Sequence, residues 1–411
     1  MNQYFKSNDT IYDITQSYPE TIAILAGNGF ENMQNAAMRE TMGKTITLEQ
    51  ALKMKKIDVN SFEERLVEAI LQNRNEADSA LLEKKKKQNA GVSIQGVLPC
   101  PIRIPLLEGF EKWLSEQDDS VKSDLDYQLQ AASMGVDWIK EQVKESESAD
   151  VLADLFISAG FDLFFDKELI GKFKEQGAFR DLTGISKYHT DFENEEIQLR
   201  DPKGQYSMLA VVAAVFLVNT EELGDREVPL SWEDLLRPEF ENSVSLPIGD
   251  FDLFNAILLN IYKKYGEDGI RKLGRSLLQS MHPAEMVKSH IKKANKPAVT
   301  IMPYFFTKMT KKGGPMKAVW PKDGAIISPI FMLSKDASSE KLRPFIDFFA
   351  SKEIGEILSH QGLFPSVNPE VDNLMDAENH YMWLGWDYIE SHDIGPLIGQ
   401  LEQLFHESKE D

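Results

Sequence analysis

The stretch Met208–Phe240, "MLAVVAAVFLVNTEELGDREVPLSWEDLLRPEF", joins a long apolar run to a short helix with clear start signals. Its apolar part, Met208–Val218, is shorter than the roughly 18 residues expected of a membrane-spanning helix and predicts a buried strand. Ser231 is a suitable N-cap, and two acidic residues follow in the first turn, where the helix dipole favours negative charge. Trp232 is predicted to hold this helix against its sheet as a core aromatic. The stretch therefore indicates a strand and a helix of an α/β structure.

The same alternation continues on both sides of this stretch, from Val97 onward. The apolar runs "VLPC", "DVLADLFISAG", "SVSLPIGD", "AVTIMPYFF" and "AIISPIFMLS" are each followed by a segment that we predict to be helical. Continuous apolar strands that alternate with helices are typical of an α/β sheet covered on both faces. No internal repeat of fixed period is present.

The composition of the 411-residue chain excludes several classes of protein. It is 42% hydrophobic and 27% charged, which fits a soluble protein of two to four domains. The net charge of −21 argues against nucleic-acid binding, and the apolar runs are too short for membrane insertion. The single cysteine excludes an internal disulfide. Because the polar start lacks a secretory signal, we expect a cytoplasmic protein as the sequence stands, or a periplasmic or extracellular one if a leader was removed.

Residues 1–75 are predicted to form a small helical domain and residues 76–95 a linker, with a candidate capping box at Thr47 and Gln50. The segments "YPE…AILAGNGF" and "TLEQALKMKKIDVNSFEERL" resemble the small N-terminal domain of iron–sulfur-cluster repair proteins, which is also fused to redox proteins of anaerobes. The loop that carries cysteines in that family reads "ENMQNAAMRE" here and has none. The resemblance therefore implies a module that docks a protein partner or dimerises.

Three segments of the larger part resemble the type 2 periplasmic solute-binding proteins, especially the binders of ferric ion, related anions and polyamines that serve ABC importers. They are "AVVAAVFLVNTEEL…VPLSWEDLLRPEFENSVSLP", "YGEDGIRKLGRSLLQSM" and "AIISPIFMLSKDASSEKLRPFIDFFASKEIGEILSHQGLFPSVNP". The resemblance implies a two-lobed α/β domain over residues 96–370 with hinge crossover strands. Its expected parts are lobe 1 at about 96–207 and 325–370 and lobe 2 at about 208–324. Residues 371–411 go beyond the family core and are predicted to form a helical extension. Its aromatic residues Tyr381, Trp383 and Trp386 are expected to pack back on the body, and a partner-binding surface is the alternative.

Ligands of open α/β sheets gather beyond the carboxyl ends of the strands, beside helix N-termini. If the resemblance holds, four such strand ends face one cleft between the lobes. The candidate ligand-binding residues at these ends are Cys100, Pro101, Arg103, Ser158, Ala159, Gly160, Phe161, Asp250, Phe251, Asp252, Tyr304 and Phe305.

Several of these residues have two interpretations. Cys100 is either a soft donor that contacts the ligand or a small buried residue. Arg103 suits a carboxylate or oxyanion through its planar fork, and a surface salt bridge is the alternative. Asp250 and Asp252 either hold a cation or cap the helix that follows them.

Metal and catalytic signatures are sparse. Ferric-binding relatives use paired tyrosines, whereas "MPYFFTKM" holds only Tyr304, so an organic or less charged ligand is favoured over iron. His282 and Tyr304 are the candidate metal ligands. No P-loop, G-x-G-x-x-G or H-E-x-x-H is present, and "FISAGFD" does not match a G-x-S-x-G elbow. We expect no cofactor and no catalytic residues.

The sequence therefore predicts a non-enzymatic protein that captures a small molecule or ion by hinge closure. Transport with an ABC permease and cytosolic sensing or delivery are both open. The alternative from another class is a cytosolic enzyme on the same fold, similar to thiamine-precursor synthases, that uses Cys100.

Overall fold

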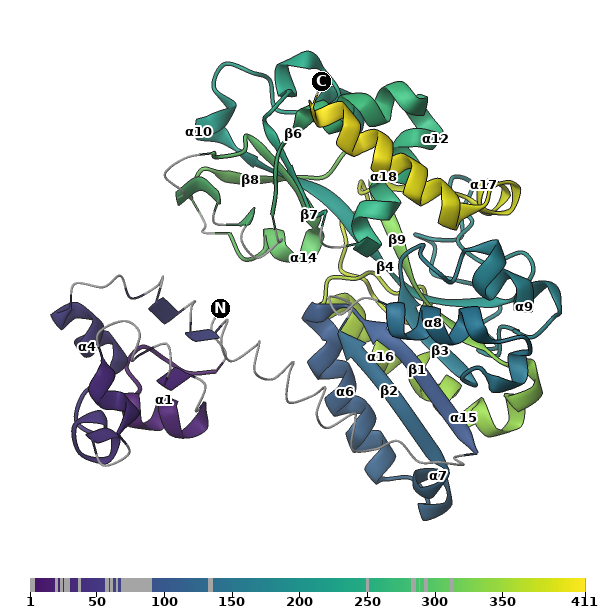
Figure 1. Ribbon diagram of the computed structural model, residues 1–411, viewed down its shortest axis with the longest axis horizontal. Coiled ribbons are helices and arrows are strands. Elements are labelled where there is room, and N and C mark those ends of the chain that lie inside the picture. Colours follow the sequence, from purple (N-terminus) through teal and green to yellow (C-terminus); the bar gives the residue numbers. More distant parts are fainter. Residues whose placement is uncertain are drawn as a thin grey trace. The chain divides into compact units, whose positions relative to one another are not determined.

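The computed structural model describes residues 4–18, 21–22, 25, 30–35, 38–55, 59, 62–63, 66–67, 91–131, 136–248, 251–281, 286–287, 289–291, 295–310 and 313–410. The chain divides into two compact units, Met1–Lys86 and Lys87–Asp411 (Figure 1). No helix in the described part of the chain has the length and apolar character needed to cross a lipid bilayer.

The smaller unit is built around two capped helices, α1 (Ile11–Ser17) and α4 (Leu48–Met54). The predicted capping box at α4 is confirmed, because the Gln50 N–H donates to Thr47 Oγ1 and the Thr47 N–H donates to Gln50 Oε1, both at 3.2 Å. Short turns of helix lie between them, η1 (Glu31–Gln34) and η2 (Arg39–Gly43). The apolar core of this unit includes Phe5, Ile11, Ile14, Leu25, Leu48, Leu52, Phe62 and Leu66.

The larger unit contains one ten-stranded sheet among its described residues. Its strands are β1 (Val92–Leu98), β2 (Leu125–Ala131), β3 (Leu155–Ala159), β4 (Tyr206–Asn219), β5 (Val244–Leu246), β6 (Leu277–Ser280), β7 (Val299–Pro303), β8 (Met316–Val319), β9 (Ala325–Ser334) and β10 (Tyr381–Met382). The order is β2-β1-β3-β9-β4-β7-β5-β6, with β10 beside β9 and β8 beside β4. We call the part around β1, β2 and β3 lobe 1, and the part around β5, β6 and β7 lobe 2.

Two long strands, β4 and β9, pass through both lobes. They pair antiparallel from Tyr206↔Leu333 to Ala214↔Ile326. β3 pairs antiparallel with β9 on the lobe 1 side, and β7 pairs antiparallel with β4 on the lobe 2 side. Every residue of β4 is buried, which confirms the strand predicted at Met208–Val218. These two strands are the crossover strands of the predicted two-lobed fold.

Helices cover the sheet of both lobes (Figure 1). The main ones are α6 (Cys100–Ser115), α7 (Asp119–Ser123), α8 (Asp137–Glu145), α9 (Lys172–Glu175), α10 (Thr220–Leu223), α11 (Trp232–Leu235), α12 (Phe251–Ser276), α14 (Tyr304–Thr307), α15 (Ser339–Phe349), α16 (Lys352–Glu356), α17 (Trp386–Ser391) and α18 (Ile394–Glu410). Single turns of helix are η4 (Ala149–Val151), η5 (Lys167–Gly171), η6 (Pro238–Phe240), η7 (Ser289–Ile291), η8 (Asp336–Ser338) and η9 (Ile357–Gln361). α18 packs along α12, where the rings of Phe254 and Phe405 meet edge to face at 5.2 Å.

The helix after the crossover strand forms as predicted. Ser231 Oγ accepts from the Asp234 N–H, and the Asp234 carboxylate accepts from the Ser231 N–H, which completes a capping box. Trp232 is fully buried. Its ring meets Phe216 of β4 edge to face at 4.9 Å, and its Nε1–H donates to the Gly324 carbonyl at 2.9 Å. Trp232 therefore ties α11 both to the crossover strand and to the turn before β9.

The aromatic residues of the C-terminal segment pack on the body, as predicted. Tyr381 and Trp383 are each 9% exposed and Trp386 is 7% exposed. The Trp386 Nε1–H donates to the Leu199 carbonyl at 3.0 Å, and Trp383 stacks on Phe161 at 5.6 Å. The segment is thus an integral part of the larger unit.

Candidate functional site

The carboxyl ends of the strands of both lobes point toward each other. β3 ends at Ala159 opposite Ile330 of β9, and β7 ends at Pro303 opposite Ala214 of β4, which pairs with Ile326 of β9. Both strands run antiparallel to their crossover partners, so they approach this position from opposite sides. Ile330 and Ile326 are four positions apart, which corresponds to about 13 Å along β9. The ends of β3 and β7 therefore face each other along the crossover strands.

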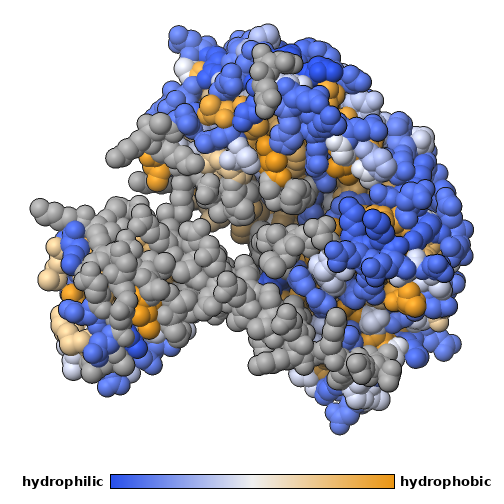
Figure 2. All heavy atoms as spheres, in the orientation of Figure 1, coloured by the Kyte–Doolittle hydropathy of each residue, from blue (hydrophilic) through white to orange (hydrophobic). Residues whose placement is uncertain are grey.

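Two further strand ends lie beside them, because β1 runs parallel to β3 and β5 runs parallel to β7. α6 begins after β1, and α12 begins after β5. We call this zone the interlobe region and define it by the ends of β1, β3, β5 and β7. Figure 2 shows that the visible surface of the larger unit is mostly hydrophilic, with scattered hydrophobic residues.

The lobes touch at Gly160, directly after β3. Gly160 has a φ of +90°, and its N–H donates to the Pro329 carbonyl of β9 at 3.0 Å. A Cβ added to Gly160 would lie only 2.9 Å from Cα of Asp252 in α12. The Ser328 hydroxyl of β9 donates to the Asp252 carbonyl at 3.1 Å. Gly160 and Asp252 therefore form the floor of the interlobe region, against the crossover strands.

The structure brings the predicted residues at the end of β3 to this region, but their side chains are buried. Ser158, Ala159 and Phe161 are each fully buried. Phe161 packs between Phe165 at 5.1 Å and Trp383 at 5.6 Å. Contact with a solute would therefore involve backbone groups of this turn, and the role of these residues remains a prediction.

Other candidates lie at the starts of α6 and α12. Cys100 and Pro101 begin α6, and Arg103 lies in its first turn and is 3% exposed. The described parts of Cys100, Pro101 and Phe251 do not include their side chains. Asp250 and the candidate metal ligand His282 lie outside the described residues.

Tyr304 and Phe305 begin α14, directly after β7, and are half-buried. Tyr304 meets Trp320 edge to face at 5.2 Å, and Trp320 meets Tyr381 in the same way at 5.5 Å. Tyr381 in turn contacts Phe192 of lobe 1 at 5.1 Å. These four rings, Tyr304, Trp320, Tyr381 and Phe192, form an aromatic chain from α14 to lobe 1.

The Tyr381 hydroxyl is buried and has no hydrogen-bond partner among the described residues. Burial raises its pKa far above the ordinary value, and the negative charge of Asp191 raises it further. Burial alone would raise the pKa of Asp191, but hydrogen bonds from His189 and Asn373 hold it below its usual value. The phenol therefore stays neutral beside an ionised carboxylate. The sequence offered no signal for the Trp320–Tyr381 pair because the two residues are far apart in the chain.

The His189–Asp191 pair predicts a pH-dependent stability. Nδ1 of His189 lies 3.1 Å from Asp191 Oδ2 and 3.2 Å from the Asp191 backbone nitrogen. The hydrogen bond to Asp191 raises the pKa of His189 above its usual value. The resulting stabilisation is complete below the unfolded pKa of about 6.5 and disappears as the pH rises through the folded value.

We therefore expect His189→Asn to destabilise the protein at pH 6 by up to about 1 kcal/mol, and by less at pH 9. The expected loss of unfolding free energy is small because both side chains are partly exposed to solvent. Urea unfolding of both proteins at the two pH values measures the difference. An equal loss at pH 6 and pH 9 would contradict this assignment.

The described residues hold no group of three or more His, Cys, Asp or Glu side chains placed to bind a metal ion. The candidate metal ligand Tyr304 instead has the Lys308 ammonium 4.7 Å from its ring centre. A cation at this position disfavours a second cation beside the same ring.

The larger unit has two lobes joined by two antiparallel crossover strands, and strand ends from both lobes face each other. This arrangement defines the type 2 solute-binding class of α/β proteins. Residues 150–392 match the sequence model of the bacterial extracellular solute-binding proteins, and the chain belongs to this family. Residues 6–62 match a separate domain of unknown function, DUF1858. No curated protein matches this chain.

Solved structures share the fold at low sequence identity. The ferric binding protein from Campylobacter jejuni is 14% identical with a TM-score of 0.53, covering 77% of this chain and 99% of that protein. The periplasmic binding protein AfuA from Actinobacillus pleuropneumoniae, with bound fructose-6-phosphate, is 15% identical with a TM-score of 0.52, covering 77% and 96%. A Trichodesmium protein in complex with iron and citrate is 13% identical with a TM-score of 0.52, covering 77% and 98%. These similarities confirm the predicted two-lobed fold.

Proposed function

We propose that the chain captures one small solute in the interlobe region and releases it when the hinge opens. The observation that carries this proposal is the opposed arrangement of β3, which pairs with β9, and β7, which pairs with β4. A solute placed there touches both lobes at once, so binding favours the closed arrangement over the open one.

The surroundings of the interlobe region favour an organic solute with an anionic group. The long helices α6 and α12 both begin there, and helix N-termini attract negative charge. Arg103 and Lys308 add cationic side chains at the start of α6 and just after α14. The aromatic residues of α14 offer an apolar wall for a carbon skeleton. Among similar structures, one holds fructose-6-phosphate and another holds iron and citrate.

Mass spectrometry under native conditions tests capture directly, with the full chain freshly purified from its source cells. We expect a mass excess that disappears after unfolding, exhaustive dialysis and refolding. The bare polypeptide mass in fresh protein, together with no thermal stabilisation by any member of a panel of sugar phosphates and organic carboxylates, would contradict capture.

Arg103 is the proposed anchor for the anionic group. A guanidinium carries five N–H donors, and one of them can donate a charge-assisted hydrogen bond to a carboxylate or phosphate. Arg103→Gln is expected to weaken binding of the co-purified solute about 10- to 100-fold, the value of one charge-assisted hydrogen bond. Calorimetry with the refolded, solute-free protein measures the change.

Arg180→Gln is the matched control, because Arg180 pairs with Asp336 on the surface of lobe 1. This variant should bind as the wild type does. Equal affinities of the Arg103→Gln and wild-type proteins, with both folded by circular dichroism, would remove Arg103 from the site.

The alternative function is an enzyme that uses Cys100. In its favour, the residue begins a 16-residue helix at a strand end, where the helix dipole stabilises a thiolate. Cys100→Ser separates the two functions: a non-enzymatic binder retains its co-purified solute, whereas an enzyme loses turnover while still binding.

The cellular location in which the protein captures its solute is a separate part of the proposal. Beside an ABC permease the protein would deliver its solute for import, and inside the cell it would sense or deliver the solute with the smaller unit docked to a protein partner. Labelling intact source cells with a membrane-impermeant amine reagent distinguishes the two, because only an external protein becomes labelled.

A further inference from the structure

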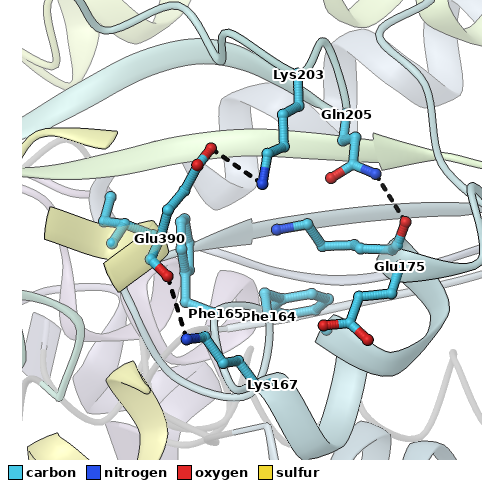
Figure 3. A pocket seen from close by; sticks show the side chains of 10 residues that line it. Phe164, Phe165, Lys167, Glu175, Lys203, Gln205 and Glu390 are labelled. Atoms are coloured by element: carbon cyan, nitrogen blue, oxygen red, sulfur yellow. Dashed lines mark hydrogen bonds and ion pairs between the residues drawn. The ribbon is translucent and has the colours of Figure 1, made fainter. Parts of the chain in front are cut away.

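Lobe 1 contains a cavity whose lining includes none of the candidate ligand-binding residues of the interlobe region. Its volume is about 420 Å³. The wall comes from the turn after β3, from η5 and α9, from the residues before β4, and from α17 of the C-terminal segment (Figure 3). The cavity is thus closed on one side by a helix that lies far away in the sequence.

Three lysines line this cavity, and two of them hold α17 in place. The Lys167 ammonium donates to the Glu390 carbonyl at 3.2 Å, and the Lys203 ammonium lies 3.3 Å from the Glu390 carboxylate. Figure 3 shows both side chains directed at Glu390. The positive charges of Lys167 and Lys203 therefore already have partners within the wall.

Lys174 is different, because its partner is a neutral group. Its ammonium donates to the Tyr206 hydroxyl at 3.0 Å and lies 4.2 Å from the centre of the Tyr206 ring. The Tyr206 hydroxyl donates its own proton to the Phe164 carbonyl at 2.6 Å. An ammonium carries three protons, so Lys174 retains the capacity to donate to a guest.

The electrostatics of the cavity favour a guest with one negative charge. The lining residues include three lysines and two glutamates, so their sum is one positive charge in a chain of net charge −21. Burial lowers the pKa of Lys174 to about 8, against the opposing effect of Asp201. An anion bound beside Lys174 would offset this cost of burying the ammonium.

We propose that this cavity is a binding site for a small organic monoanion, a carboxylate that accepts a hydrogen bond from Lys174 and packs its carbon skeleton against Phe164 and Phe165. The occupant would contact α17 through Ile389, so binding should also stabilise the C-terminal segment. This proposal does not depend on solute capture between the lobes.

Benzoate is a suitable probe, and benzyl alcohol is its neutral counterpart of similar shape. Ligand-observed NMR with the full chain should show benzoate binding at pH 7 and at least tenfold weaker binding of benzyl alcohol, because one charge-assisted hydrogen bond is lost. Binding should weaken as the pH rises beyond about 8, since Lys174 loses its proton. The other charged groups that influence this titration are Asp201, Lys203 and Glu390.

Lys174→Met keeps most of the side-chain volume and removes the charge, so it should weaken benzoate binding at least tenfold. Lys174→Arg should restore most of the affinity. Lys172→Met is the matched control, because the Lys172 ammonium bonds to the Val143 carbonyl and does not line the cavity.

Three results would overturn the proposal. The first is equal benzoate affinity in wild type and a folded Lys174→Met variant. The second is loss of binding in Arg103→Gln but not in Lys174→Met, which would place benzoate between the lobes. The third is no binding of benzoate at millimolar concentration.

Discussion

Trp232→Ala is expected to lower the free energy of unfolding of the larger unit by about 3–5 kcal/mol, the usual cost of removing a large aromatic side chain from a core. The side chain is fully buried, packs on Phe216 and donates to the Gly324 carbonyl. Its loss leaves a cavity between α11 and β4 and an unpaired buried carbonyl. Urea unfolding followed by far-ultraviolet circular dichroism measures the change.

Trp232→Phe separates the contribution of ring packing from the contribution of the hydrogen bond to Gly324. The phenyl ring retains the contact with Phe216, but the Gly324 carbonyl loses its donor, which should cost about 1–3 kcal/mol. Leu230→Ala is the control in the same segment, because Leu230 is 37% exposed and its loss should be small. A Trp232→Ala variant as stable as the Leu230→Ala variant would contradict the assigned role.

Gly160→Ala should both destabilise the protein and weaken solute retention. The backbone φ of +90° strains any residue with a Cβ, at about 1–3 kcal/mol. The new Cβ would also lie 2.9 Å from Cα of Asp252, and relief of that overlap costs about 1–3 kcal/mol more. Because Asp252 lies in the first turn of the lobe 2 helix α12, relief of the overlap should separate the lobes where the proposed solute bridges them.

Gly184→Ala is the matched control for backbone strain. Gly184 has a φ of +70°, and nothing lies within 4 Å of an added Cβ. This variant should lose stability through backbone strain alone, because its added Cβ overlaps with nothing. It should keep its co-purified solute in native mass spectrometry. If Gly160→Ala retained the solute as well as Gly184→Ala does, the interlobe contact would have no part in binding.

Local patterns were sufficient to predict the framework of the larger unit. The apolar run at β4 is buried along its whole length, so both faces of the strand are apolar. The strand could therefore be predicted without knowing which face points toward the core. The Ser231 capping box involves residues three apart, and such short-range hydrogen bonds can be read directly from the sequence.

The sites depend on distant contacts and were less predictable. Phe161 follows a strand end, and no local pattern indicates that it stacks on Trp383 of the C-terminal segment. Lys174 lies in "KFKE", a charged pattern that indicates a solvated helix face. Its burial arises because α17 closes the cavity from a distant part of the chain, and no local pattern carries that information.

The most direct test of the central claim is the distance between the lobes with and without solute. Spin labels at Glu108→Cys on α6 and Glu267→Cys on α12, in a Cys100→Ser background, place one exposed probe on each lobe. Pulsed electron resonance then compares the freshly purified protein with the same protein stripped by unfolding and refolding. Capture between the lobes predicts a mean distance shorter by more than about 2 Å in the loaded protein. Identical distances, in samples whose masses show solute bound in one and absent in the other, would contradict it.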